Sequence, residues 1–228
     1  TGGDARAWID AATGSLTRAL ELNPNLADEA YTNLSEANEL LARLEMEARR
    51  APTSYLDRAR ANLETGLRLK ATSVPLLQRR ALVELAAAQW AIETGRSPER
   101  PLAEAQGALA RALEVNPRHA GLHLTQAELY RWRGEWRLAT GGSPAAEARS
   151  GLEAVRRSLA INPSNARAVA MEGVLHLLAA RDPAASDTVE SAKAAAERLT
   201  RALTLNGFLK REYAQSLAGA HRLAGGLE

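Results

Sequence analysis

The sequence contains no cysteine. Disulfides and thiolate ligands both need this residue, so a disulfide framework and thiol chemistry are excluded. The absence of cysteine is compatible with either a reducing or an oxidising compartment. Aromatic residues are also few, with one Phe, four Tyr and four Trp among 228 residues, although 46% of the chain is hydrophobic. Much of this apolar content is Ala and Leu, which favours closely packed helices over a sheet sandwich.

Long apolar runs and a strong charge imbalance are missing as well. The longest apolar windows, 82–92 and 173–180, are short or interrupted by polar residues, so none is predicted to span a bilayer. Twenty-nine basic and 27 acidic residues give a net charge of +2, a weak indication of an anionic partner. Residues 1–4 carry no signal-peptide pattern, as expected for a segment cut from a longer polypeptide. We expect a cytoplasmic location, with the outer face of a membrane-anchored parent as the alternative.

A pattern of side-chain size recurs along the whole chain. Each occurrence places a small residue, a large apolar residue four positions later and a second small residue three positions after that, which forms one stripe on an α-helix. A leucine follows the second small residue directly, and an Asn-Pro or Asn-Gly pair three positions later ends most of these helices. These leucines are 47, 46, 46 and 44 residues apart: Leu20, Leu67, Leu113, Leu159 and Leu203.

The spacing small-x3-large-x2-small-x4-Pro resembles the second half of the tetratricopeptide repeat (TPR). The tight glycine site in the first half holds Leu34, Ala81, Ala127 and Gly173. The resemblance implies an all-α, right-handed superhelix of about ten antiparallel helices. Because the common TPR period is about 34 residues, each hairpin here is predicted to be longer by about six residues per helix.

We therefore predict a single TPR-like domain over residues 1–228. Residues 1–24 form the second half of a preceding repeat, four repeats follow at 25–71, 72–117, 118–163 and 164–206, and 207–228 form a C-terminal capping helix. The predicted helices are 4–22, 26–49, 53–70, 74–94, 98–115, 119–140, 144–161, 165–181, 185–205 and 208–223.

Two turns share the pattern Trp-x4-Gly-x-Ser-Pro and are predicted to be hairpin tips. The glycine suits a left-handed helix C-terminus, and Ser-Pro suits an N-cap followed by a first-turn proline. The tryptophan is expected to fill the gap between the lengthened helices. The residues with these structural roles are Trp90, Gly95 and Pro98 in one tip, and Trp136, Gly141 and Pro144 in the other.

The candidate partner-binding residues form polar columns on the first helices of the repeats. One column holds Asn33, Arg80, Gln126 and Glu172, and its neighbour holds Glu84, Tyr130 and His176. A basic and aromatic cluster consists of Arg131, Arg133 and Arg137 around Trp132 and Trp136. Such columns either line a groove that binds a peptide or satisfy one another between helices. The cluster is either a site for an acidic or phosphorylated peptide or a solvated helix face.

No catalytic or cofactor motif is found. The sequence has no G-x-S-x-G, no P-loop and no G-x-G-x-x-G pattern. His119 and His123 share a helical face but lack the glutamate of H-E-x-x-H and an obvious third ligand, so no metal and no cofactor are predicted. We expect a chain that is not an enzyme, within a parent polypeptide that can carry a kinase domain outside it.

The expected function is a non-catalytic scaffold that binds a protein or peptide. The long repeats and the T-G-x-S-P turns resemble the repeat regions that follow the catalytic domain in some bacterial serine/threonine protein kinases, which implies a regulatory or partner-recruiting role in signalling. Two alternatives stay open: an RNA-binding helical-repeat module, although nucleic acid is not the expected partner, and a self-association domain. The expected state is a monomer or a weak homodimer formed through the terminal helices.

Overall fold

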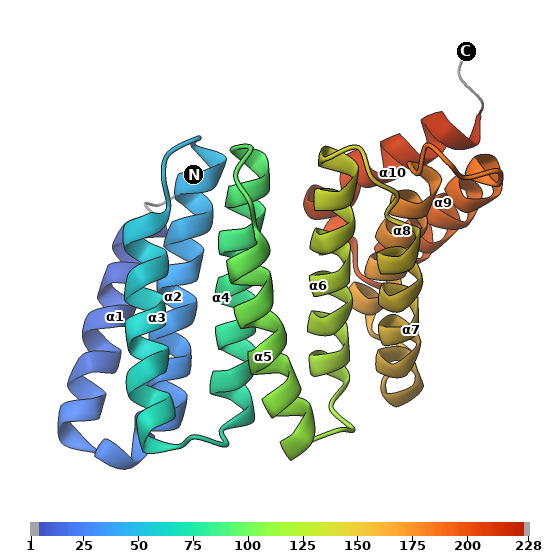
Figure 1. Cartoon of the computed structure of the whole chain (residues 1–228). Coiled ribbons are helices and arrows are strands. Elements are labelled where there is room, and N and C mark those ends of the chain that lie inside the picture. Colours follow the sequence, from blue (N-terminus) through green and yellow to red (C-terminus); the bar gives the residue numbers. More distant parts are fainter. Residues whose placement is uncertain (1–4, 226–228) are drawn as a thin grey trace. The chain divides into compact units, whose positions relative to one another are not determined.

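The computed structural model describes residues 5–225, in which every regular element is a helix (Figure 1). The α-helices are α1 (Ala5–Leu22), α2 (Ala27–Glu47), α3 (Thr53–Leu69), α4 (Val74–Glu93), α5 (Glu99–Val115), α6 (Ala120–Ala139), α7 (Ala145–Ile161), α8 (Ala166–Ala180), α9 (Thr188–Leu205) and α10 (Lys210–Ala224). Two short 3-10 turns, Pro24–Leu26 and Gly207–Leu209, precede α2 and α10. Residues 1–4 and 226–228, where the predicted first helix begins and the predicted capping segment ends, lie outside the described residues. The all-α helical-repeat fold predicted from the sequence is confirmed.

The chain forms two compact halves, Thr1–Pro117 and Arg118–Glu228. In the N-terminal half, α2 packs against α1, α3 and α4, and α4 packs against α3 and α5. In the C-terminal half, α8 packs against each of the other four helices, and α6 with α7 and α9 with α10 also pair directly. Each half is thus a run of consecutive helical hairpins. The prediction that the repeats continue as one domain across Pro117 stays a prediction.

One predicted helix start is wrong by three residues. The sequence predicts a helix from residue 185, whereas α9 begins at Thr188. The carboxylate of Asp182 accepts the N–H of Ala184 at 3.0 Å and the hydroxyl of Ser143 at 2.5 Å, and its carbonyl accepts the N–H of Ala185 at 3.0 Å. This bonding holds the residues after Asp182 in a turn, which delays the helix.

The helices approach closely because small residues occupy the predicted stripe. Ala105, Leu109 and Ala112 on α5 are buried, as are their equivalents on α3, α7 and α9. A Cβ atom added at Gly151 would lie 2.6 Å from the Cδ2 of Leu175, closer than real Cβ atoms approach. The alternation of small and large side chains therefore sets how tightly each hairpin packs.

The tips that join α2 to α3, α4 to α5 and α6 to α7 are Schellman turns, in which two N–H groups return to carbonyls at the helix end. Gly95 has φ of 69° and donates its N–H to the carbonyl of Ile92 at 3.0 Å, while Gly141 has φ of 80° and donates to Leu138 at 3.1 Å. The first tip has the same bonding with Arg49, at φ of 58°, in the glycine position. Two tips therefore carry the residue that a left-handed backbone favours, and one does not.

The residues after each glycine prepare the returning helix. The hydroxyl oxygens of Ser97 and Ser143 accept the backbone N–H two residues later at 3.3 Å, and the prolines that follow them, Pro98 and Pro144, are buried. Trp90 and Trp136 are both half-buried. The side-chain N–H of Trp90 is buried and has no hydrogen-bond partner among residues 5–225, so this residue acts through its ring surface.

Candidate functional site

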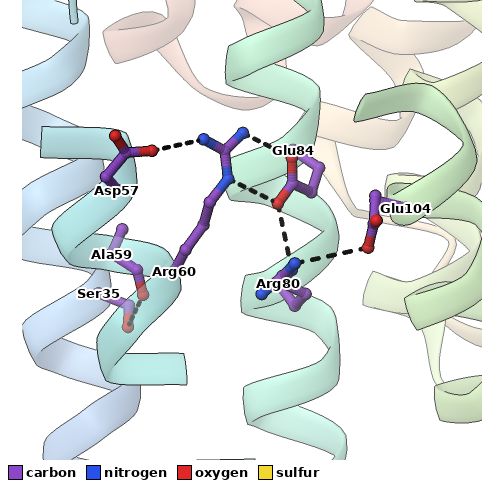
Figure 2. Close-up of polar contacts among 7 residues, drawn as sticks. All are labelled: Ser35, Asp57, Ala59, Arg60, Arg80, Glu84 and Glu104. Carbon is purple, nitrogen blue, oxygen red and sulfur yellow. Dashed lines mark hydrogen bonds and ion pairs between the residues drawn. The ribbon is translucent and has the colours of Figure 1, made fainter. Parts of the chain in front are cut away.

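A buried carboxylate lies at the centre of the polar network in the N-terminal half (Figure 2). Glu84 on α4 is only 2% exposed. It accepts two hydrogen bonds from Arg60 on α3, with Nε to Oε1 at 2.9 Å and Nη2 to Oε2 at 2.8 Å. The Nε of Arg80, one turn earlier on α4, lies 3.1 Å from Oε1. A buried carboxylate is stable only when such partners compensate its lost hydration.

The network continues on both sides of Glu84. Arg60 also contacts Asp57 at 2.9 Å, and Arg80 reaches Glu104 on α5 at 3.5 Å (Figure 2). The hydrogen bond to Glu84 raises the pKa of Arg60 above its ordinary value, against the opposing effect of burial. The ion pairs thus connect α3, α4 and α5 and fix the position of two guanidinium groups.

An open groove lies beside this network, between α3 and α5 with α4 as its floor. Its volume is about 680 Å³. The residues that line it are Glu64, Leu67 and Arg68 on α3, Leu77 and Arg80 on α4, and Arg100, Ala103, Glu104, Gly107, Ala108 and Arg111 on α5. Small and apolar side chains form the surface between charged ones, so the groove offers both apolar contact and ionic anchors.

Four arginines and two glutamates line the groove, so its formal charge is positive. The side chain of Arg100 makes no hydrogen bond or ion pair within residues 5–225. Arg111 donates one hydrogen bond to the carbonyl of Ala71 at 2.8 Å, which anchors it from the loop before α4. Arg68 and Glu64 form an exposed pair at 3.5 Å, a contact that contributes little to stability.

The remaining residues of the two predicted columns occupy varied surroundings. Asn33 is exposed and lines a smaller pocket with Asp28 and Pro75. Gln126 and Tyr130 are half-buried, and the side-chain oxygen of Gln126 has no hydrogen-bond partner among the described residues. Arg80 pairs with Glu84 on its own helix and with Glu104 on α5. Its charge is therefore compensated without contacts to the other residues of its column.

Glu172 and His176 lie together on α8. Glu172 pairs with Arg198 on α9 at 3.4 Å. Burial lowers the pKa of the half-buried His176 below its ordinary value, and Arg198 adds to this while Glu172 opposes it. This part of the column thus joins α8 to α9.

The predicted basic and aromatic cluster lies on α6. Arg137 is exposed and contacts Glu147 at 3.2 Å, whereas Arg133 is half-buried. The guanidinium of Arg131 lies 4.2 Å from the ring centre of Trp132, which is buried. The cluster is therefore divided between an intramolecular cation–π contact and an exposed arginine.

The two histidines of the sequence pattern have different environments. The ring Nδ1 of His119 accepts the backbone N–H of Leu122 at 3.2 Å, so His119 caps the N-terminus of α6. His123 is buried. In the described part of the chain, no three His, Cys, Asp or Glu residues gather as a metal-binding group. Within residues 5–225, no helix has the length and apolar character needed to cross a membrane.

Sequence reasoning missed the contributions of the second helices. Arg60, Arg100, Gly107 and Arg111 were not among the candidates, although they supply much of the network and the groove. Residues 100, 103, 104, 107, 108 and 111 of α5 share one face and include no large apolar side chain. The absence of large apolar side chains from this face of α5 is the signal in the sequence that could have located the groove.

No family model matches the chain, and no curated protein matches it. The likeness to the TPR family therefore stays a prediction that depends on the spacing of small and large residues.

Proposed function

We propose that this chain is a TPR-like interaction module that binds a protein or peptide partner and performs no catalysis itself. The observation that carries the proposal is the open groove between α3 and α5. A partner that enters it meets apolar surface from Leu67 and Ala103 and charged groups beside them. Hot-spot contacts in protein interfaces combine these two properties.

The ion-pair network supports this function because it orders the binding surface in advance. Glu84 and Glu104 hold Arg80 in place at the groove floor. A side chain that is already ordered loses less conformational entropy when a partner binds. The network therefore lowers the entropic cost of association, although its buried carboxylate does not contact the partner.

The proposed context is a regulatory or partner-recruiting region of a bacterial signalling protein, such as a serine/threonine kinase. The likeness of the T-G-x-S-P turns to the repeat regions of these kinases supports it. A rigid helical scaffold in that position would bring a substrate or a regulator close to the catalytic domain.

A peptide selection tests the proposed function. Sixteen-residue random peptides displayed on phage are selected against the chain, and the enriched peptides are synthesised and titrated by fluorescence anisotropy. We expect Kd values of about 100 µM or tighter, or roughly −5.5 kcal/mol. Labelled single-stranded RNA and light scattering of the chain alone are measured in parallel. Binding of RNA, or dimerisation, without any peptide binding would contradict the proposal.

A further inference from the structure

We propose that the groove between α3 and α5 binds an acidic amphipathic helix of about three turns from a protein partner. The helix lies along α5, with carboxylates near Arg100 and Arg111 and apolar side chains on Leu67 and Ala103. This inference rests on the proposed function as a peptide-binding module, and it adds the place of binding and the chemistry of the partner.

The length of the bound segment follows from the face that α5 presents. Its lining residues begin at Arg100 and end at Arg111. Eleven residues of α-helix span about 16 Å, or three turns. Two carboxylates on one face of a partner helix, eleven positions apart, match this separation.

The surface between the two arginines allows a helix to approach closely. Ala103, Gly107 and Ala108 present little or no side chain there. A Cβ atom added at Gly107 would meet nothing within 4 Å, so the space above it is open. Helix axes approach more closely when the residues at their contact are small.

A helical partner fits this groove better than an extended one. The walls and floor are α3, α4 and α5, whose backbone groups are bonded within their own helices. An extended peptide would find no sheet edge to pair with, whereas a helix satisfies its own backbone and needs only side-chain contacts.

The charges select an acidic partner. Arg100 has no partner within the described residues, and the bond of Arg111 to the Ala71 carbonyl leaves its positive charge uncompensated. A guanidinium binds a carboxylate through paired, charge-assisted hydrogen bonds. Glu64 on α3 and Glu104, which lies on α5 between Arg100 and Arg111, repel a segment with the wrong charge pattern.

Two labelled peptides of sixteen residues test the charge requirement. Both consist of Ala, Leu and Gln with blocked ends, and they carry either Glu or Lys at positions 3 and 14. We expect the Glu peptide to bind the chain about tenfold or more tightly than the Lys peptide. The double variant Arg100→Glu with Arg111→Glu should reverse this preference. The double variant Arg149→Glu with Arg156→Glu, the same charge change at two exposed residues of α7, should alter the Kd by less than twofold.

A second pair of variants tests occupation of the groove. Gly107→Phe should weaken binding of the Glu peptide about tenfold or more, because the ring fills the space above α5. Gly107→Ala should change the Kd by less than threefold. Circular dichroism and thermal melting confirm that both variants fold, as the open space at this position leads us to expect.

Several outcomes would overturn the inference. It is wrong if the Glu and Lys peptides bind equally, or if Gly107→Phe leaves binding unchanged. If peptides from the selection bind but are insensitive to charge reversal at Arg100 and Arg111, the module binds elsewhere, and the proposed function survives alone. If no peptide binds, the proposed function and this inference are both wrong. A dimer that these charge reversals dissociate would assign the groove to a second copy of the chain.

Discussion

The same substitution, glycine to alanine, should have opposite effects at two helical positions of the C-terminal half. Gly173 lies on α8 where that helix meets α9, and Gly219 lies on α10. A Cβ atom at Gly173 would be 2.7 Å from the Cγ of Leu199 and 3.0 Å from the carbonyl oxygen of Ala195. At Gly219 the nearest atom would be the Cδ2 of Leu177, at an ordinary contact distance of 3.8 Å.

The expected magnitudes follow from these distances. Replacing a helical glycine with alanine stabilises by about 0.5–1 kcal/mol, because alanine loses less backbone entropy. Gly219→Ala should raise the free energy of unfolding by this amount. At Gly173 a backbone oxygen cannot move aside without a shift of α9, and overpacking costs about 1–3 kcal/mol. The net effect of Gly173→Ala should be a loss of about 0.5–2 kcal/mol.

Urea unfolding followed by far-UV circular dichroism measures both changes. The two positions lie in the same half of the chain, so both variants report on the same packing. Gly66→Ala and Gly107→Ala repeat the comparison in the N-terminal half, where a Cβ at Gly66 would lie 2.9 Å from Leu76. If Gly173→Ala stabilised the protein as much as Gly219→Ala does, the close approach of α8 to α9 would be refuted.

Three other predictions address the ion pairs and the hairpin tips. Glu84→Ala leaves arginines without their buried partner and should reduce the free energy of unfolding by about 1–3 kcal/mol in urea titrations. Glu153→Ala, at an exposed pair, should cost less than about 0.5 kcal/mol, and equal effects would contradict the role of burial. Hydrogen bonds from Arg50 and then Arg6 lower the pKa of Glu45 to about 2, from 4.5. Its ionised form therefore stabilises the fold fully above pH 4.5, and this stabilisation is lost as pH falls toward 2. The difference in unfolding free energy between wild type and Glu45→Gln should shrink over the same range, and a difference independent of pH would refute this. Arg49 and Gly95 both have positive φ, a conformation that glycine adopts without strain. In thermal melts, Arg49→Gly should therefore raise stability by about 0.5–1 kcal/mol, and Gly95→Ala should lower it by about 1 kcal/mol. Changes of the same sign would refute this.

Much of the fold could be predicted because its signals are local. The recurring stripe of small and large residues locates the second helices, and the Asn-Pro and Gly-x-Ser-Pro turns locate most of their ends. The start of α9 escaped because Asp182, which holds the turn before it through the N–H groups of Ala184 and Ala185, is also bonded to Ser143, 39 residues away in the sequence. No local pattern reveals such a bond.

The candidate site could be predicted only in part, for a related reason. Arg80 and Glu84 were found because they occur at equivalent repeat positions with polar character. Arg60 was missed because its pairing with Glu84 depends on which faces of α3 and α4 meet. The groove itself arises where α3 and α5 stand apart above α4, and the sequence alone does not give that separation.

The most direct test of the account is an NMR titration of the isotope-labelled chain with the Glu peptide. We predict that the amide signals that shift most belong to α5 between Arg100 and Arg111 and to the end of α3 that carries Leu67 and Arg68. Shifts concentrated instead around Asn33 and its neighbours on α2, or spread evenly over the chain, would contradict the assignment of the groove as the binding site.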